Sequence, residues 1–188
     1  MAADCQAAAD KLVQLIDDCG GHLVTGFVGT PYLLHVLSSY GHADVAWSLL
    51  LREEYPSWLY AVNRGATTVW EHWDSLKEDG SFWSDNMNSF NHYAYGSVAD
   101  WVYMVAAGIQ TVEEAPGYEK IRIAPTPDAR LDRLEATIET RHGTVRSCWR
   151  KEGDLWRYEI TTPSETTVVI DGESRVVSAG TWYFYSKI

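Results

Sequence analysis

The spacing of the apolar residues changes near residue 115, and this change constrains the fold more than any other feature of the chain. Before that point, apolar residues recur at helical spacing in segments near 4–18, 31–39, 42–53, 56–63, 68–74 and 90–107. After it, β-branched and polar residues alternate, as in 136–140, 156–160 and 166–170. The sequence therefore predicts a helical domain over residues 1–115 and a β domain over residues 116–188.

The helical part has glycine and proline residues where short helical hairpins would begin and end their helices. Gly20 and Gly21 suit the end of the first helix, Pro31 suits the first turn of the second, and Gly41 separates the second from the third. The segment 42–53 carries one apolar stripe at helical spacing, which must pack against other helices. So few helices cannot cover all of their own apolar faces, and we expect the uncovered faces to favour self-association.

The β part has a turn signal between each pair of expected strands. The pairs His142-Gly143 and Asp171-Gly172, and the triplet Glu152-Gly153-Asp154, stand where hairpin turns are needed. Short alternating strands at this spacing are typical of a β-sandwich. We therefore expect a small antiparallel β-sandwich over residues 116–188.

Charge and composition exclude several partners. The 188 residues are 46% hydrophobic and carry a formal net charge of −11, so the chain has a core and would repel nucleic acid or an anionic membrane surface. No apolar stretch is long enough to span a bilayer, the first residues do not resemble a signal peptide, and the three cysteines form no disulfide or zinc pattern. We expect a cytoplasmic location for this stretch, while a longer parent protein can carry an export signal upstream.

Polar and aromatic residues are densest between residues 65 and 93. Four of the 9 tryptophans, Trp70, Trp73, Trp83 and Trp101, fall within 32 residues, and Glu71 lies between the first two. A carboxylate flanked by tryptophans can sit in a partly apolar pocket, where desolvation tunes its proton affinity. Glycoside hydrolysis requires such a group, so this region is the candidate site.

Each candidate also has a purely structural interpretation. Thr68-x-x-Glu71 is a capping box that would begin a helix, and on pattern alone this is the more common meaning. His92 near the start of a helix is more often a packed side chain than a ligand contact. Asp74 fits a helix end or a surface position, and Asp79 followed by glycine fits a turn.

Other classes of site lack their motifs. Glu71, His72 and His92 do not have the spacing of a metal-binding motif, so we expect no metal. The serine-hydrolase elbow, the dinucleotide fingerprint and the phosphate-binding loop are likewise missing from the sequence. We expect no cofactor.

Three stretches, read together, resemble a known family. They are GHLVTGFVGTPYLL at 21–34, ATTVWEHWD at 66–74 and MNSFNHYAYGSV at 87–98. In this order they closely resemble the bacterial α-L-rhamnosidases of glycoside hydrolase family 78, and the likeness covers nearly the whole chain.

The resemblance implies a fold and an activity. Residues up to about 115 would be the last hairpins of an (α/α)6 barrel, followed by the family's C-terminal β-sandwich, and the activity would be inverting hydrolysis of terminal α-L-rhamnosyl groups. Glu71 matches the general base and His92 a contact to a sugar hydroxyl. Trp70, Trp73 and Trp83 are the implied pocket walls, and the substrate would be a rhamnosylated carbohydrate or glycoside.

The chain departs from the family in one respect. The general acid of these enzymes lies in an acidic, arginine-containing motif upstream, and no part of this sequence resembles it. We therefore expect the chain to be a fragment that is inactive or nearly so by itself, because general acid catalysis contributes about a hundredfold to ten-thousandfold. The alternatives are another glycosidase built on the same helical barrel, and a carbohydrate-binding or structural module in which the sandwich is the working part.

Overall fold

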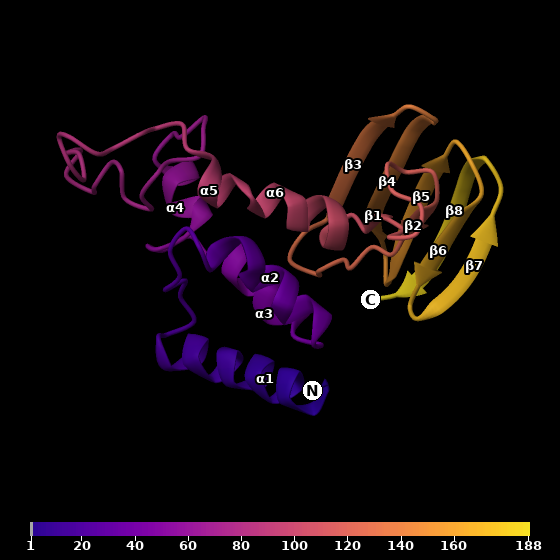
Figure 1. The fold of residues 1–188 in the computed structure, drawn as a ribbon, viewed down its shortest axis with the longest axis horizontal. Helices are drawn as coiled ribbons and strands as arrows, with labels where there is room; N and C mark the ends of the chain where they lie inside the picture. Colours follow the sequence, from indigo (N-terminus) through magenta and orange to yellow (C-terminus); the bar gives the residue numbers. More distant parts are fainter. Residues whose placement is uncertain (1) are drawn as a thin grey trace. The chain divides into compact units, whose positions relative to one another are not determined.

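The computed structural model describes residues 2–188 and divides into two compact units, Met1–Ala99 and Asp100–Ile188. The first unit is helical, and the second contains all the named β-strands (Figure 1). This confirms a helical part followed by a β-sandwich. The change in sequence pattern near residue 115 falls inside the second unit, and the domain boundary at that residue stays a prediction.

Four helices form where the sequence predicts them: α1 (Ala2–Asp18), α2 (Thr30–Ser39), α3 (Ala43–Leu50) and α4 (Trp58–Asn63). Gly20 and Gly21 both have positive φ, and the Gly21 amide donates to the Ile16 carbonyl at 2.8 Å, which ends α1. Ser57 caps α4 by accepting a 3.0 Å hydrogen bond from the Tyr60 amide. The helix starts and stops thus follow local rules.

Helices α2 and α3 pack against each other as an antiparallel hairpin around Gly41, whose φ is +85°. Each helix buries one apolar face, which confirms the stripe expected for the third helix. The buried residues are Leu33, Leu34 and Leu37 on α2 and Ala46, Trp47 and Leu49 on α3.

Two helix predictions are wrong. No helix forms over 68–74, where the chain is a run of bends and turns. The single helix expected over 90–107 is instead broken into α5 (Tyr93–Gly96), α6 (Val98–Trp101) and the π-helical turn η1 (Val102–Ala106). In η1 the Ala107 amide donates to the Val102 carbonyl, five residues back, so the helix widens where it ends.

The β-sandwich consists of two four-stranded sheets (Figure 1). Hairpin turns occur at all three predicted places, and Asp171 and Gly172 both have positive φ, as a type I′ turn requires. One pair, β2 with β6, is parallel, so the expectation of only antiparallel strands is wrong there. One sheet is β1 (Ile109–Thr111), β2 (Ile121–Ile123), β6 (Thr166–Ile170) and β7 (Glu173–Val177); the other is β3 (Arg133–Thr140), β4 (Gly143–Glu152), β5 (Leu155–Thr162) and β8 (Gly180–Lys187).

Aromatic residues fill the core of the sandwich. Trp149 is 0% exposed, donates from Nε1 to the Ala106 carbonyl at 2.8 Å and meets the Trp156 ring edge to face at 5.1 Å. Both are packing residues, whereas Trp182 is 39% exposed.

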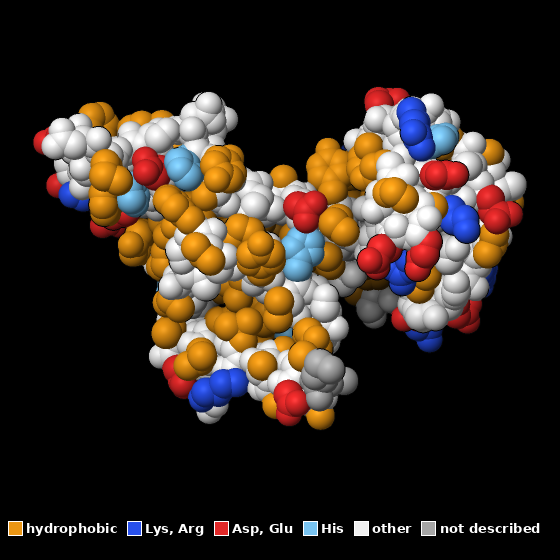
Figure 2. Space-filling view, viewed as in Figure 1, with side chains coloured by type: hydrophobic (Ala, Val, Ile, Leu, Met, Phe, Trp, Pro, Cys, Tyr) orange, Lys and Arg blue, Asp and Glu red, His pale blue; other side chains and the backbone are white. Residues whose placement is uncertain are grey.

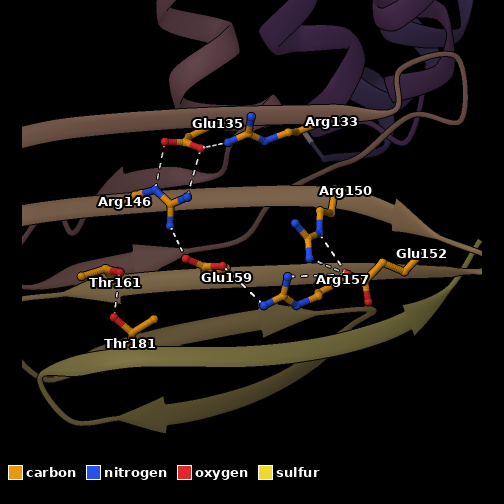
Figure 3. Close-up of polar contacts among 9 residues, drawn as sticks. All are labelled: Arg133, Glu135, Arg146, Arg150, Glu152, Arg157, Glu159, Thr161 and Thr181. Atoms are coloured by element: carbon orange, nitrogen blue, oxygen red, sulfur yellow. Dashed lines mark hydrogen bonds and ion pairs between the residues drawn. The ribbon is translucent and has the colours of Figure 1, made fainter.

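A ladder of ion pairs crosses the outer face of the second sheet (Figure 3). Arg146 on β4 donates two 3.0 Å hydrogen bonds to Glu135 on β3 and one of 2.6 Å to Glu159 on β5. The Arg146 guanidinium holds the pKa of Glu135 below its usual range. The ladder therefore favours one alignment of the three strands.

Among residues 2–188, no helix is long and apolar enough to cross a membrane.

Candidate active site

The segment from Val69 to His92 is a long loop, which we call the excursion, and its two ends are joined by backbone hydrogen bonds. The Glu71 amide donates to the Ser89 carbonyl at 2.9 Å, and the His92 amide donates to the Val69 carbonyl at 2.8 Å. Residues 69–71 therefore lie beside residues 89–92, although 18 positions separate Glu71 from Ser89. This backbone pairing places Glu71 and His92 on two adjacent segments of the chain.

Glu71 is held by the backbone opposite it. Its Oε2 accepts a 2.8 Å hydrogen bond from the Ser89 amide, and the side chain is partly buried. Across residues 2–188, no donor is hydrogen-bonded to Oε1. One carboxylate oxygen thus fixes the group while the other remains available to accept a proton.

The capping-box interpretation of Thr68 and Glu71 is wrong. Thr68 donates its hydroxyl hydrogen to the Phe90 carbonyl, and Glu71 bonds to Ser89 instead of the Thr68 amide. Both side chains serve contacts to the far end of the excursion, so the local cap never forms.

His92 is oriented by one nitrogen and by two rings. It caps α5, with Nδ1 accepting from the Ala94 amide at 3.3 Å. Its ring stacks on Phe27 at 4.8 Å and on Tyr93 at 5.4 Å. In the neutral ring an accepting Nδ1 leaves the proton on Nε2, which is then a hydrogen-bond donor.

The three predicted wall tryptophans have different environments. Trp70 is 6% exposed, with Phe90 edge on at 5.3 Å, and Trp73 stacks on Tyr95 at 3.8 Å. Both line a cavity of about 80 Å³, which is small beside the roughly 300 Å³ or more of typical ligand pockets. Trp83 is 43% exposed, so of these three it presents the most surface to solvent.

Trp83 stacks on the residue next to Glu71. The His72 and Trp83 rings lie 3.6 Å apart at 15°, and the Trp83 amide donates to the Ser75 carbonyl at 3.1 Å. The same carbonyl accepts a 2.8 Å bond from the Asn88 side chain. Buried Ser75 is therefore the point at which both sides of the excursion meet.

Two buried polar atoms near Glu71 lack partners. His72 Nε2 and Asn88 Oδ1 make no hydrogen bond to any residue in 2–188. An unpaired buried polar atom is unfavourable, and such atoms are often found at functional sites.

Two other acids, Asp74 and Asp79, lie in the same excursion. Asp79 accepts hydrogen bonds from the Ser81 amide and hydroxyl, which lower its pKa, in the predicted turn. Asp74 does not lie at the end of a helix, because no helix forms over 68–74. The pKa of Tyr55 is raised first by the burial of Tyr55 and then by the charge of Asp74. Residues 2–188 contain no group of three or more His, Cys, Asp or Glu side chains placed to hold a metal ion.

Comparisons with known proteins agree with this architecture. Residues 1–106 match the bacterial alpha-L-rhamnosidase 6 hairpin glycosidase domain, and residues 108–180 match the bacterial alpha-L-rhamnosidase C-terminal domain. The chain belongs to the bacterial α-L-rhamnosidase family.

Individual relatives support this membership. An alpha-L-rhamnosidase of Streptomyces avermitilis is 44% identical over 165 residues, which are 88% of this chain and 16% of that protein. One from Formosa agariphila is 42% identical over 87% of this chain and 18% of its own length. The chain thus spans less than a fifth of the length of these relatives.

Solved rhamnosidase structures share the fold. The Streptomyces avermitilis alpha-L-rhamnosidase complexed with L-rhamnose superposes with a TM-score of 0.87 at 38% identity, covering 97% of this chain and 20% of that one. The native enzyme from Aspergillus terreus gives 0.92 at 36% identity, covering 98% and 22%.

Sequence reasoning missed several partners of the candidate site residues in this chain. The Ser89 amide that holds Glu71, and the Phe27 ring beneath His92, are distant in sequence from the groups they orient. Phe27 lies in the first family-like stretch and Ser89 in the third, so the co-occurrence of these stretches was the available signal.

Proposed function

We propose that the parent of this chain is an inverting α-L-rhamnosidase in which Glu71 is the general base. The observation that supports this most directly is the fixing of Glu71 by the Ser89 amide through Oε2, with Oε1 free of hydrogen bonds from residues 2–188. A base held through one oxygen is positioned to deprotonate water with the other. The substrate would be a rhamnosylated carbohydrate or glycoside.

His92 would contact the sugar. Its Nδ1 is occupied by the Ala94 amide, so Nε2–H would donate to a rhamnose hydroxyl, and the stack on Phe27 would fix the direction of that bond. Trp83, with its exposed indole, would form a pocket wall, while Trp70 and Trp73 would support it from the packed interior.

The reaction would need a second carboxyl group. In an inverting glycosidase an acid protonates the leaving oxygen while the base activates water on the opposite face, with the two groups about 6.5–9.5 Å apart. We place that acid outside this chain, and we therefore expect the purified chain not to release nitrophenol from an aryl α-L-rhamnoside. Release by the chain that is lost on Glu71→Ala would overturn this part of the proposal.

A chimera tests the role of Glu71 directly. In the Streptomyces avermitilis relative, the stretch that aligns with this chain is replaced by the chain itself. The chimera is expected to hydrolyse the aryl rhamnoside, with β-L-rhamnose as the first product by proton NMR. Glu71→Gln is expected to reduce kcat by about a hundredfold to ten-thousandfold.

Glu78→Gln is the matched control, because Glu78 lies in the same excursion with its side chain 87% exposed. It is expected to leave kcat within a factor of two or three, since exposed ion pairs contribute little. Equal losses in the two variants, or α-L-rhamnose as the first product, would contradict the assignment of Glu71 as the base of an inverting enzyme.

A further inference from the structure

Three arginines lie in one row across the outer face of the second sheet. Arg133 on β3 is directly opposite Arg150 on β4, and Arg150 is directly opposite Arg157 on β5. We call these three residues the guanidinium row. Like charges directly opposite each other on adjacent strands are destabilising. Proteins tend to break such a local rule where a functional site requires it, so the row is a candidate binding site.

Two acids next to the row are held by a fourth arginine. Glu135 and Glu159 lie directly opposite Cys148 on its two sides. Arg146 donates two 3.0 Å hydrogen bonds to Glu135 and one of 2.6 Å to Glu159, and Figure 3 shows both carboxylates joined to it. Arg133 shares Glu135 with Arg146. These acids therefore neutralise the row only in part.

Arg157 has long contacts to its acidic neighbours. Its nitrogens lie 3.5 Å from Glu152 and 3.5 Å from Glu159, whereas a charge-assisted hydrogen bond is about 2.7–2.9 Å long. The side chain is only 18% exposed, and its guanidinium carbon lies 4.8 Å from the centre of the Tyr183 ring. A partly buried guanidinium with such long contacts retains hydrogen-bonding capacity that a ligand can use.

A small cavity of about 40 Å³ lies within this cluster. One water molecule needs roughly 10–15 Å³ on this measure, so the cavity has room for about three waters or for the oxygens of one oxyanion. The side chains of Arg133 and Arg150, 59% and 46% exposed, can move to admit a larger group. The residues that line the cavity are Arg133, Arg146, Cys148, Arg150, Arg157 and Glu159.

The charges around the cavity select an anion. Figure 3 shows four arginines and three glutamates on this face, so the cluster is positive although the whole chain has a net charge of −11. The planar guanidinium group donates paired hydrogen bonds to the oxygens of phosphate-like and carboxylate groups. A small oxyanion fits this local charge, whereas a long polyanion would also meet the negative charge of the rest of the chain.

We propose that the guanidinium row binds one divalent tetrahedral oxyanion, with Arg150 and Arg157 as its main donors. The oxyanion can be a free phosphate or sulfate ion, or the same group carried as an ester on a sugar. Its charge would offset the repulsion between the arginines, so binding would stabilise the sandwich. The site is separate from the candidate active site and does not depend on Glu71.

The test is an NMR titration of the ¹⁵N-labelled full chain with sodium sulfate, sodium phosphate and glucose-6-phosphate, at an ionic strength held constant with sodium chloride. We expect saturable shifts of the Nε–H signals of Arg150 and Arg157, with a Kd of about 1 mM, as about two charge-assisted hydrogen bonds would give. Arg150→Gln and Arg157→Gln should each weaken binding about tenfold or more, because each removes a charged donor. Tighter binding of glucose-6-phosphate than of the two inorganic ions would identify an ester as the ligand, and equal binding would identify the free ion.

Arg175→Gln is the matched control. Arg175 lies on β7 in the other sheet, with a side chain 63% exposed and a 2.9 Å ion pair to Glu173, so this variant loses the same charge outside the row. Its oxyanion affinity should equal that of the unchanged chain. Glu71→Gln should also bind equally, so a failure of this proposal is distinguishable from a failure of the proposed catalytic role.

Two outcomes would overturn the proposal. One is that neither inorganic dianion shifts the Arg150 and Arg157 signals beyond the effect of chloride, at concentrations up to tenfold above the expected Kd. The other is an equal Kd in Arg150→Gln, Arg157→Gln and Arg175→Gln, which would show that the anion is attracted by general charge. The spectrum of each variant reports whether it is folded, so a misfolded variant is recognised and the remaining one decides.

Discussion

Replacing His72 with phenylalanine should stabilise the chain, although it removes a residue next to the proposed base. His72 Nε2 is buried without a hydrogen-bond partner in the described chain, which costs about 1–3 kcal/mol. Phenylalanine removes that atom and retains a flat ring to stack on Trp83, now 3.6 Å away. Its larger ring strains the packing and offsets part of the gain. We expect a net increase of about 1 kcal/mol in the free energy of unfolding.

The contribution of the stack is separated by a second variant. His72→Ala also removes the unpaired nitrogen but loses the ring contact with Trp83, which contributes about 0.5–1.5 kcal/mol beyond the area it buries. The alanine variant should therefore be less stable than the phenylalanine variant by at least that amount.

The assay is urea unfolding followed by tryptophan fluorescence, with His42→Phe as the matched control. His42 Nε2 lies 2.8 Å from Asp10 Oδ1, so the same replacement there breaks a hydrogen bond and should lower the free energy of unfolding. Destabilisation by His72→Phe as large as that in the control would refute the reasoning, because it would mean that Nε2 has a partner such as a bound water.

Three further predictions concern the fold. Gly108→Ala should cost several kcal/mol in urea unfolding, because φ is +76° and a Cβ would lie 2.2 Å from the Ala124 backbone; Gly41→Ala, with similar φ and open space, should cost only about 1 kcal/mol. Arg146→Gln should move the acid-unfolding midpoint to higher pH, measured by circular dichroism. The lowered folded pKa of Glu135 gives stability above its unfolded pKa that is lost as pH falls through the folded value, and the variant reduces this effect. The helical unit exposes Val28 by 85%, and Figure 2 shows hydrophobic side chains gathered over this unit, so light scattering should detect concentration-dependent self-association that Val28→Glu reduces; a monomer at all concentrations would contradict this.

The sequence predicted the elements whose signals are local. Gly20, Gly21, Pro31 and the three hairpin turns mark boundaries that the structure confirms. Alternation of residues likewise located the strands around Trp156 and Val168, because one face of each is buried.

Prediction failed where distant partners outcompeted local ones. Thr68 and Glu71 had the pattern of a helix cap, yet their side chains bond to Phe90 and Ser89. β1 was missed because its three residues, Ile109–Thr111, are too short to show alternation and form a strand only by pairing with β2. The tryptophans around Glu71 marked the region of the candidate site, but the roles of Glu71 and His92 came from the family resemblance, since no spacing rule links the two residues.

The two backbone hydrogen bonds that join residues 69–71 to residues 89–92 hold the ends of the excursion together independently of the residues between them. Residues 77–86, which include the exposed rings of Phe82 and Trp83, form the part of the loop between these joined ends. Doubling the length of such a loop costs only about 0.6 kcal/mol in closure entropy. Insertions and deletions within residues 77–86 can therefore be accommodated while the hydrogen bonds that hold the proposed base stay in place.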